Sequence, residues 1–215
     1  MTDWDAALSL PIGPRRVNRS ISLRPARPAD PEREQAKGLP LRPVDVEWFA
    51  ARGLLGRPAC TRYGLDLLMR DLVVFDRRQR FEFARDVGGP GPGAMSVYTV
   101  PARDAAGDVV DVVAWHPRSG RIASWLGRIG VLGEDSLWRP LGCDEPLLVH
   151  RDPVGWLRAD WRGVVVVHET RARRQLLDAG ALLAEDVDHG EELDAMLRRV
   201  RLPRILVGQP AEAAA

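Results

Sequence analysis

The sequence predicts an α+β protein with an antiparallel β meander, a small N-terminal helical unit and a C-terminal strand–helix layer. Short runs that alternate apolar and polar residues, separated by turn residues, lie between residues 95 and 125 and are typical of antiparallel strands. Apolar residues at helical spacing precede them. Gly163–Glu169 contains four consecutive valines, which indicate a strand buried on both faces. A 3.6-residue period begins directly behind it, over Thr170–Glu185.

Composition places the chain among ordinary globular proteins. It has 215 residues, of which 45% are hydrophobic and 28% charged, enough for one domain with a tail or two small lobes. Its apolar runs fall short of the roughly 18 residues that span a bilayer, and residues 1–20 lack the apolar core of a signal peptide. Cys60 and Cys143 are far apart in the sequence and are expected to be reduced thiols. We therefore expect a cytoplasmic protein with no membrane partner.

The positive charge of the chain is carried almost entirely by arginine. The formal net charge is +1 and Lys37 is the single lysine, so the chain is not strongly basic as a whole. A GC-rich coding bias is one explanation of this composition. Recognition of phosphate by the planar guanidinium is the other.

Residues 1–43 are predicted to form a mostly disordered or draped arm, rich in arginine and proline. Its prolines disfavour helix, and it has too little apolar surface to offset the entropy of ordering. The arm is either a solvated leader or an electrostatic contact for nucleic acid or a protein partner. Its candidate contacts are Arg15, Arg16 and Arg19.

Residues 44–87 are predicted to form a helical unit with a β-hairpin. Asp45 is the expected cap of a first helix, a second helix is expected over Thr61–Arg70, and strands at 72–75 and 81–83 form the hairpin. Arg77, Arg78 and Arg80 lie in its turn. This outline resembles a winged-helix DNA reader; the alternative is a helical lobe packed on the sheet.

Residues 94–208 are predicted to form the α+β core, after a glycine-rich hinge at 88–93. The meander strands are expected at 95–101, 108–115 and 121–125, with a further strand at 147–149. Asp152-Pro153 has the pattern of a helix cap followed by proline. After the valine-rich strand and its helix, the pattern predicts a last helix over Glu191–Val200 and a final strand at 205–207. Arg171, Arg173 and Arg174 lie near the start of the helix that follows the valine-rich strand.

Three carboxylates are the candidate catalytic and metal-binding residues. Glu169 ends the valine-rich strand, and ligands bind at that edge of open α/β sheets. In an extended segment, Asp186 and Asp188 face the same way, so the three residues together are candidates to bind Mg²⁺, which prefers oxygen ligands. The alternative is a solvated acidic loop between two helices. The histidines and cysteines lack zinc-site spacing, and no nucleophile elbow is present.

At these residues the chain resembles a toprim domain, the metal-dependent fold of primases and topoisomerases. Val164–Val167 followed by Glu169 is similar to the first toprim element, and Asp186-Val-Asp188-His-Gly190 is similar to the second. The meander at 97–125 also resembles the β region that precedes toprim in some phage and plasmid primases. Only the 16 residues 170–185 separate the two elements. The resemblance implies a truncated or degenerate relative that has lost catalysis and kept a binding or structural role.

Three hypotheses for function follow. The first is a non-catalytic, nucleic-acid-associated accessory protein of mobile-element origin, whose arginine clusters contact phosphates of DNA or RNA. The second is a magnesium-dependent toprim-like nucleotidyl transferase or nuclease that uses Glu169, Asp186 and Asp188. The third is a protein-interaction module, because the chain has seven tryptophans and tryptophan is enriched at interface hot spots.

Overall fold

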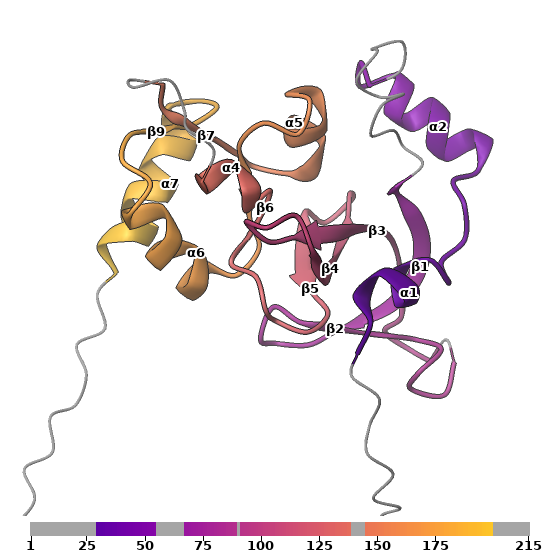
Figure 1. The fold of residues 1–215 in the computed structure, drawn as a ribbon. Helices are drawn as coiled ribbons and strands as arrows, with labels where there is room; N and C mark the ends of the chain where they lie inside the picture. Colours follow the sequence, from indigo (N-terminus) through magenta and orange to yellow (C-terminus); the bar gives the residue numbers. More distant parts are fainter. Residues whose placement is uncertain (1–28, 55–66, 90, 139–144, 200–215) are drawn as a thin grey trace, which may run out of the picture.

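Two β-sheets form the frame of the protein (Figure 1), seen in a computed structural model that describes residues 29–54, 67–89, 91–138 and 145–199. The first sheet is antiparallel, with strand order β2-β1-β3-β4-β5, and the second has the order β6-β8-β7-β9. Short helices pack around both sheets. The α+β class predicted from the sequence is confirmed.

The first sheet contains the predicted meander and the predicted hairpin. Its strands are β1 (Met69–Phe75), β2 (Phe81–Phe83), β3 (Met95–Arg103), β4 (Val109–His116) and β5 (Arg121–Ser124). β1 also pairs with β3, so the hairpin and the meander share one sheet across the glycine-rich segment 88–93. A bridge between Arg80 and Ser124 brings the two edge strands together. The sheet therefore curls until β2 and β5 meet, and it crosses the expected boundary between residues 44–87 and 94–208.

The second sheet is mostly parallel and contains the valine-rich strand. Its strands are β6 (Val131–Leu132), β7 (Leu147–His150), β8 (Val164–Val166) and β9 (Leu182–Leu183). β8 and β9 run parallel to β7 on its two sides, and β6 is antiparallel to β8. Val164 and Val165 are 0% exposed, because β8 is an inner strand covered on both faces. The prediction of a buried central strand is confirmed.

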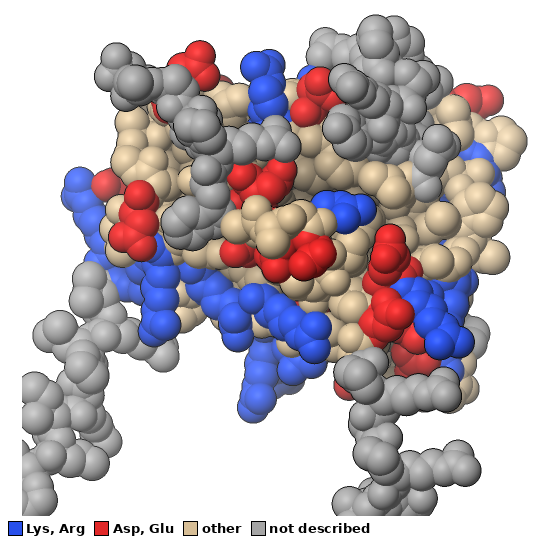
Figure 2. All heavy atoms as spheres, in the orientation of Figure 1, with Lys and Arg blue, Asp and Glu red and all other residues tan. Residues whose placement is uncertain are grey.

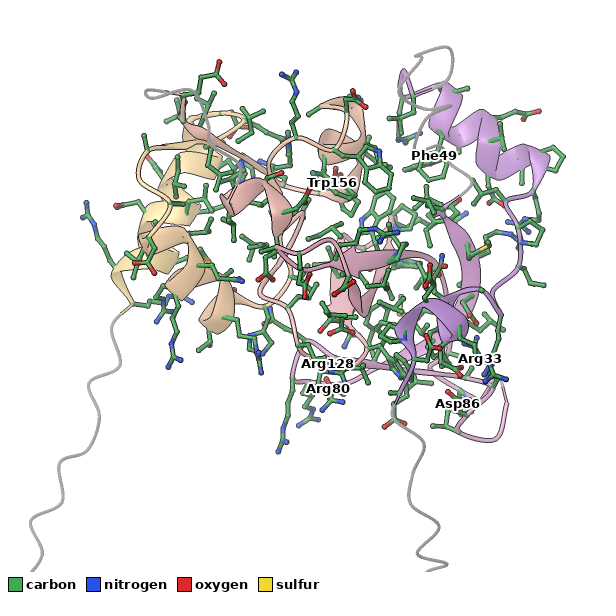
Figure 3. The ribbon with its side chains drawn as sticks, viewed as in Figure 1. Arg33, Phe49, Arg80, Asp86, Arg128 and Trp156 are labelled. Atoms are coloured by element: carbon green, nitrogen blue, oxygen red, sulfur yellow. The ribbon has the colours of Figure 1, made fainter. Side chains whose placement is uncertain are left out.

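The helices α5 (Pro153–Arg158), α6 (Glu169–Leu177) and α7 (Val187–Arg198) follow β7, β8 and β9, and α4 (Asp135–Trp138) follows β6. α5 packs in the core between the two sheets, where Trp156 lies with Phe49 and Trp115; Figure 3 labels Trp156 and Phe49. α6 and α7 cover the other face of the second sheet with Leu176 and Leu193. The helices that follow the neighbouring strands β7 and β8 thus lie on opposite faces of the second sheet.

The N-terminal predictions need three corrections. A helix, α1 (Pro31–Gln35), lies inside the expected disordered arm, because proline at the first helical position loses no needed hydrogen bond. In α2 (Pro43–Ala50), Asp45 is at the third position and accepts from the backbone N–H of Arg42, so it does not occupy the cap itself. Met69 and Arg70, expected in a second helix, begin β1. Residues 1–28 and 55–66 lie outside the described residues.

The C-terminal helices also differ from the prediction. The helix behind β8 ends at Leu177 instead of Glu185, because Gly180 turns the chain with φ +74° and β9 follows. α7 begins at Val187 instead of Glu191, because the carboxylate of Asp186 accepts from the backbone N–H of His189 and caps it. The expected strand at 205–207 is outside the described residues. No helix among those described has the length and apolarity needed to cross a membrane.

Candidate nucleic-acid interface

A buried carboxylate fixes the loop of residues 125–130, which joins β5 to β6. Asp111, on β4, is 0% exposed. It accepts hydrogen bonds from the backbone N–H groups of Val112 (2.8 Å), Leu126 (2.8 Å) and Arg128 (2.7 Å). Three N–H groups that would otherwise be orphaned are therefore satisfied by one charge, and the position of the Arg128 backbone is set by β4.

Arginine side chains connect this loop to the hairpin and to α6. Arg80 donates to the carbonyl of Trp125 through Nε (3.3 Å) and Nη2 (3.2 Å). Arg128 donates to the carbonyl of Val110 (3.2 Å), and Arg171 donates to the carbonyl of Arg128 (3.1 Å). The hairpin, the loop and the start of α6 are thus contiguous, although they are distant in the sequence.

A fourth arginine extends this surface along the hairpin turn. Arg121 donates to the carbonyl of Asp76 (3.0 Å), and its guanidinium lies 4.6 Å from the ring centroid of Phe75. We call the resulting surface the basic strip, and we include in it the exposed arginines next to these four along the chain: Arg77 and Arg78 in the same hairpin turn, and Arg174, one turn after Arg171 on α6. Its members are Arg77, Arg78, Arg80, Arg121, Arg128, Arg171 and Arg174. Figure 3 labels Arg80 and Arg128 side by side, and Figure 2 shows basic side chains gathered along this edge of the molecule.

The positive charge of the arginines that make these bonds is not compensated by a bound carboxylate. Among the residues that the structure describes, the guanidiniums of Arg80, Arg121, Arg128 and Arg171 are bonded to carbonyls and to no carboxylate. Asp76, in the same turn, directs its carboxylate to the backbone N–H groups of Arg78 and Arg80. Arg151, by contrast, is paired with two carboxylates, although carbonyl-bonded arginines also occur away from the strip, for example Arg173.

The structure brings together two of the three arginine clusters considered in the sequence. Arg77, Arg78 and Arg80 lie on the strip, as do Arg171 and Arg174. Arg173 does not, because its Nε donates to the carbonyl of Met196 (2.8 Å) between α6 and α7. Arg15, Arg16 and Arg19 are outside the described residues. Sequence reasoning missed Arg121 and Arg128, which join the strip only through the register of β5 and the bonds of Asp111.

The three candidate carboxylates are not brought together. Glu169 begins α6, where its Oε2 lies 3.6 Å from Nη1 of Arg199. Asp186 caps the opposite end of α7, and thirteen residues at 1.5 Å each separate Asp186 and Arg199 by about 20 Å. Asp188 is exposed in the first turn of α7, so Asp186 and Asp188 are not in an extended segment. Within the described ranges no group of three histidine, cysteine or acidic residues is placed to hold a metal ion.

A basic residue of the protein lies between the acidic residues at the carboxyl ends of β7 and β9. Arg151 donates to Asp186 (2.8 Å) and Glu192 (2.9 Å). The hydrogen bond from Arg151 lowers the pKa of Asp186, and bonding to Asp186 and then Glu192 raises the pKa of Arg151. Ligands of open α/β sheets bind at such an edge, but here a guanidinium occupies the position between the carboxylates.

A histidine is locked beside this ion pair. His150 is 8% exposed, with Nδ1 3.1 Å from Oε1 of Glu185 and Nε2 3.0 Å from the carbonyl oxygen of Arg162. Because a carbonyl oxygen only accepts, Nε2 of His150 donates to Arg162. Burial lowers the pKa of nearby His189. His150 thus connects β7 to Glu185, whose backbone N–H in turn donates to Nδ1 of His189 in α7 (3.3 Å).

Comparisons with protein-family models, with curated proteins and with solved structures find no match. Function is therefore inferred from the charges, contacts and cavities of the molecule.

A second buried carboxylate joins α2 to the first sheet. Asp45 accepts hydrogen bonds from Arg42 and from the hydroxyl of Tyr98 (3.0 Å), and it forms an ion pair with Arg70, whose Nε lies 3.2 Å from Oδ2. The hydrogen bond from Arg42 is the main cause that lowers the pKa of Asp45 to about 2, against the opposing effect of burial. Burial, and then the bond to Asp45, raises the pKa of Tyr98 to about 12. This network ties the helix to β1 and β3.

Packing accounts for the tryptophans whose side chains are described. Trp115 and Trp156 are buried in the core between the sheets, with Trp48 and Trp161 packed against it. Trp125 packs against the core on the other face of the first sheet. Trp4 and the side chain of Trp138 are outside the described part. For those five indoles, the tryptophan content requires no interaction surface.

Proposed function

We propose that the protein is a non-catalytic, nucleic-acid-associated accessory protein that holds the phosphate backbone on its basic strip. The observation that carries the proposal is the set of four guanidiniums bonded to carbonyls, those of Arg80, Arg121, Arg128 and Arg171. A guanidinium has five donors, so each one keeps donors for phosphate oxygens after its carbonyl bond is made. Phosphate is matched by the planar fork of arginine.

The carbonyl bonds also prepare the strip for binding. Ordering a free arginine side chain costs up to about 2 kcal/mol of rotamer entropy, and part of that cost is met before the ligand arrives. Carboxylates paired with these arginines would instead weaken phosphate binding, because a bound phosphate would have to displace them. The strip therefore combines fixed geometry with unneutralised charge, which is what contact with a polyanion requires.

The non-catalytic part of the proposal is supported by Arg151. A magnesium site built on Asp186 would need further oxygen ligands and room for the ion, whereas Arg151 contacts both Asp186 and Glu192. Between Glu169 and Asp186 the chain does form a helix and a short strand, α6 and β9. This arrangement supports a degenerate toprim relative. The proposal therefore includes an origin in a mobile element and a cytoplasmic location.

The test is the salt dependence of binding to a fluorescently labelled 20-base-pair DNA duplex, followed by anisotropy between 50 and 200 mM NaCl. With four to seven phosphates neutralised, log K against log salt should have a slope between about −3.6 and −6.3. Affinity should then fall by a factor of about 10² to 10⁴ over that range. Absence of any anisotropy change at 20 mM NaCl, with duplex or single strand, contradicts the proposal.

A matched pair of variants locates the contact. Arg128→Gln removes one charge from the strip and should reduce the magnitude of the slope by about 0.9. Arg33→Gln removes one exposed charge from α1, apart from the strip (Figure 3), and should leave the slope unchanged. Equal effects of the two substitutions would show that the attraction is general and that the strip is not the site.

A further inference from the structure

A cavity of about 480 Å³ opens between the end of β3, strand β6 and the C-terminal end of α5. Its apolar lining includes Trp156, Trp161, Pro101 and Leu132. The volume is in the range of about 300 to 1,000 Å³ that is usual for small-molecule sites, which combine apolar walls with a few polar groups. The cavity lies apart from the ion pairs of Arg151.

Two indole rings form one wall. The ring centroids of Trp156 and Trp161 are 4.6 Å apart and the rings are inclined at 48°. Trp156 is 3% exposed, and its Nε1 donates to the carbonyl of Gly163 (3.1 Å), which fixes the ring. Trp161 is only half-buried. The outer ring thus rests on a rigid inner one.

The backbone is strained where it places the outer ring. Asp160 and Trp161 have φ values of +57° and +65°, a region in which glycine is usual and a bulky residue is an outlier. Two successive non-glycine residues in this conformation end α5. Strain of this kind persists where the surroundings hold it, and it is concentrated at ligand sites.

Charged groups line the mouth of the cavity. Arg103 donates to the carbonyl of Gly107 (2.7 Å) and Arg162 donates to the carbonyl of Ala159 (3.2 Å). In the described part of the chain neither guanidinium is bonded to a carboxylate, which is the arrangement found on the basic strip. Asp160 also lines the cavity, and a carboxylate accepts from N–H groups on the exposed Watson–Crick edge of an unpaired base.

The cavity is close to the strip along the first sheet. Arg103 pairs with Val109 in the β3–β4 ladder, and the next residue, Val110, accepts the hydrogen bond from Arg128. Paired strand residues are separated by about 5 Å and successive ones by about 3.4 Å. A nucleic-acid strand with a phosphate on Arg128 can therefore reach the mouth of the cavity with a nucleotide about two positions further along.

We propose that this cavity takes one unpaired nucleotide of the bound strand, with the base against Trp161 and a phosphate on Arg103 and Arg162. The inference rests on the proposed nucleic-acid function and adds a preference for single strands. The strip contacts the phosphate backbone of single or double strands alike, whereas the cavity accepts only an unpaired nucleotide. Stacking of a base on an aromatic side chain is independent of sequence. A base within a duplex is stacked and paired, and so does not enter.

The test compares a labelled 15-nucleotide oligo(dT) with a 15-base-pair duplex for wild type, Trp161→Gly and Trp161→Phe. Glycine adopts φ +65° without strain, so Trp161→Gly removes the ring while relieving the backbone. It should weaken binding of oligo(dT) by about 10- to 100-fold and that of the duplex by less than twofold. Trp161→Phe keeps an aromatic face and should restore most of the loss. Circular dichroism and the urea midpoint show whether Trp161→Gly folds. If it does not, the double substitution Arg103→Gln with Arg162→Gln takes its place in the comparison.

The outcomes separate the cavity from the strip. Equal losses for oligo(dT) and duplex, or no loss for either, overturn the cavity proposal and leave the strip intact. If the wild type binds neither, the proposed nucleic-acid function fails, and the cavity is then judged with the mononucleotide dTMP by saturation-transfer NMR. A dTMP signal lost in Trp161→Gly supports the cavity as a nucleotide site; a signal that is absent or independent of Trp161 overturns it.

Discussion

Replacing Asp111 with asparagine tests how the loop of the basic strip is held. Oδ1 of Asp111 accepts from Val112 and Leu126, and Oδ2 accepts from the N–H of Arg128 at 2.7 Å. In Asp111→Asn the amide oxygen can keep the first two bonds, which leaves the amide NH₂ facing the N–H of Arg128. A donor then faces a donor at a site that is 0% exposed.

The expected loss follows from the bond that is broken. A hydrogen bond to a charged group contributes about 1.5–3 kcal/mol, and a buried donor without a partner costs about 1–3 kcal/mol. Because these two contributions overlap, we expect Asp111→Asn to lower the free energy of unfolding by about 2–4 kcal/mol. For a protein of this size the melting temperature should fall by roughly 4–16 °C. Urea unfolding, followed by circular dichroism, measures the change as a shift in midpoint at constant m-value.

Asp76→Asn is the matched control. Asp76 also accepts from two backbone N–H groups, those of Arg78 (2.7 Å) and Arg80 (2.9 Å), but both use Oδ1 and the side chain is exposed. The amide oxygen of asparagine can keep both bonds while its NH₂ group faces water, so the loss should be below about 1 kcal/mol. Equal losses in the two variants, or a loss below 1 kcal/mol for Asp111→Asn, would refute the geometric reasoning.

Three further predictions concern stability. Because the pKa of Asp45 is lowered to about 2, its ion pairs stabilise the folded state by at most about 2 kcal/mol above pH 4, and this stabilisation is lost as the pH falls through 2. In Asp45→Asn the free energy of unfolding should therefore change less between pH 4 and pH 2 than in the wild type. The same pH dependence in both proteins would contradict this. A Cβ on Gly133 (φ +84°) would lie 2.4 Å from the carbonyl oxygen of Gly163, whereas a Cβ on Gly107 (φ +91°) would meet nothing within 4 Å. The free energy of unfolding, measured by urea denaturation, should therefore fall by about 2–4 kcal/mol in Gly133→Ala and by about 1 kcal/mol in Gly107→Ala. Asp160→Gly should stabilise the protein by about 0.5–1 kcal/mol, since glycine adopts φ +57° freely; Asp160→Ala should not, and thermal unfolding compares the two.

The strands were predictable because their signals are local. Alternation at 95–125 and the run Val164–Val167 each specify a strand whatever the rest of the chain does, and β3, β4, β5 and β8 confirm them. The pairing of β1 with β3 was not predictable in this way, because it depends on the path across 88–93. The helix signals are ambiguous, because proline disfavours the interior of a helix but favours its first position, where both Pro31 and Pro43 lie.

The candidate site shows what spacing cannot give. Asp186 and Asp188 face one way only in an extended segment, and the capping bond from Asp186 to His189 makes that segment helical. The residue that contacts Asp186 across the sheet edge is Arg151, which is 35 residues earlier in the chain. Asp186 therefore lies at the carboxyl ends of β7 and β9, and the guanidinium beside it depends on the pairing of these two strands, which residue spacing does not reveal.

The carbonyl-bonded arginines also explain why arginine, and not lysine, suits this surface. Arg80 uses both Nε and Nη2 on a single carbonyl, a fork that an ammonium group does not have. Lysine at the same position would make one bond and lose the orientation of the remaining donors. Arg80→Lys, which preserves the formal charge, should therefore keep the salt slope of DNA binding while lowering affinity at every salt concentration. If the two proteins bind equally, charge alone accounts for the strip and the fixed geometry contributes nothing.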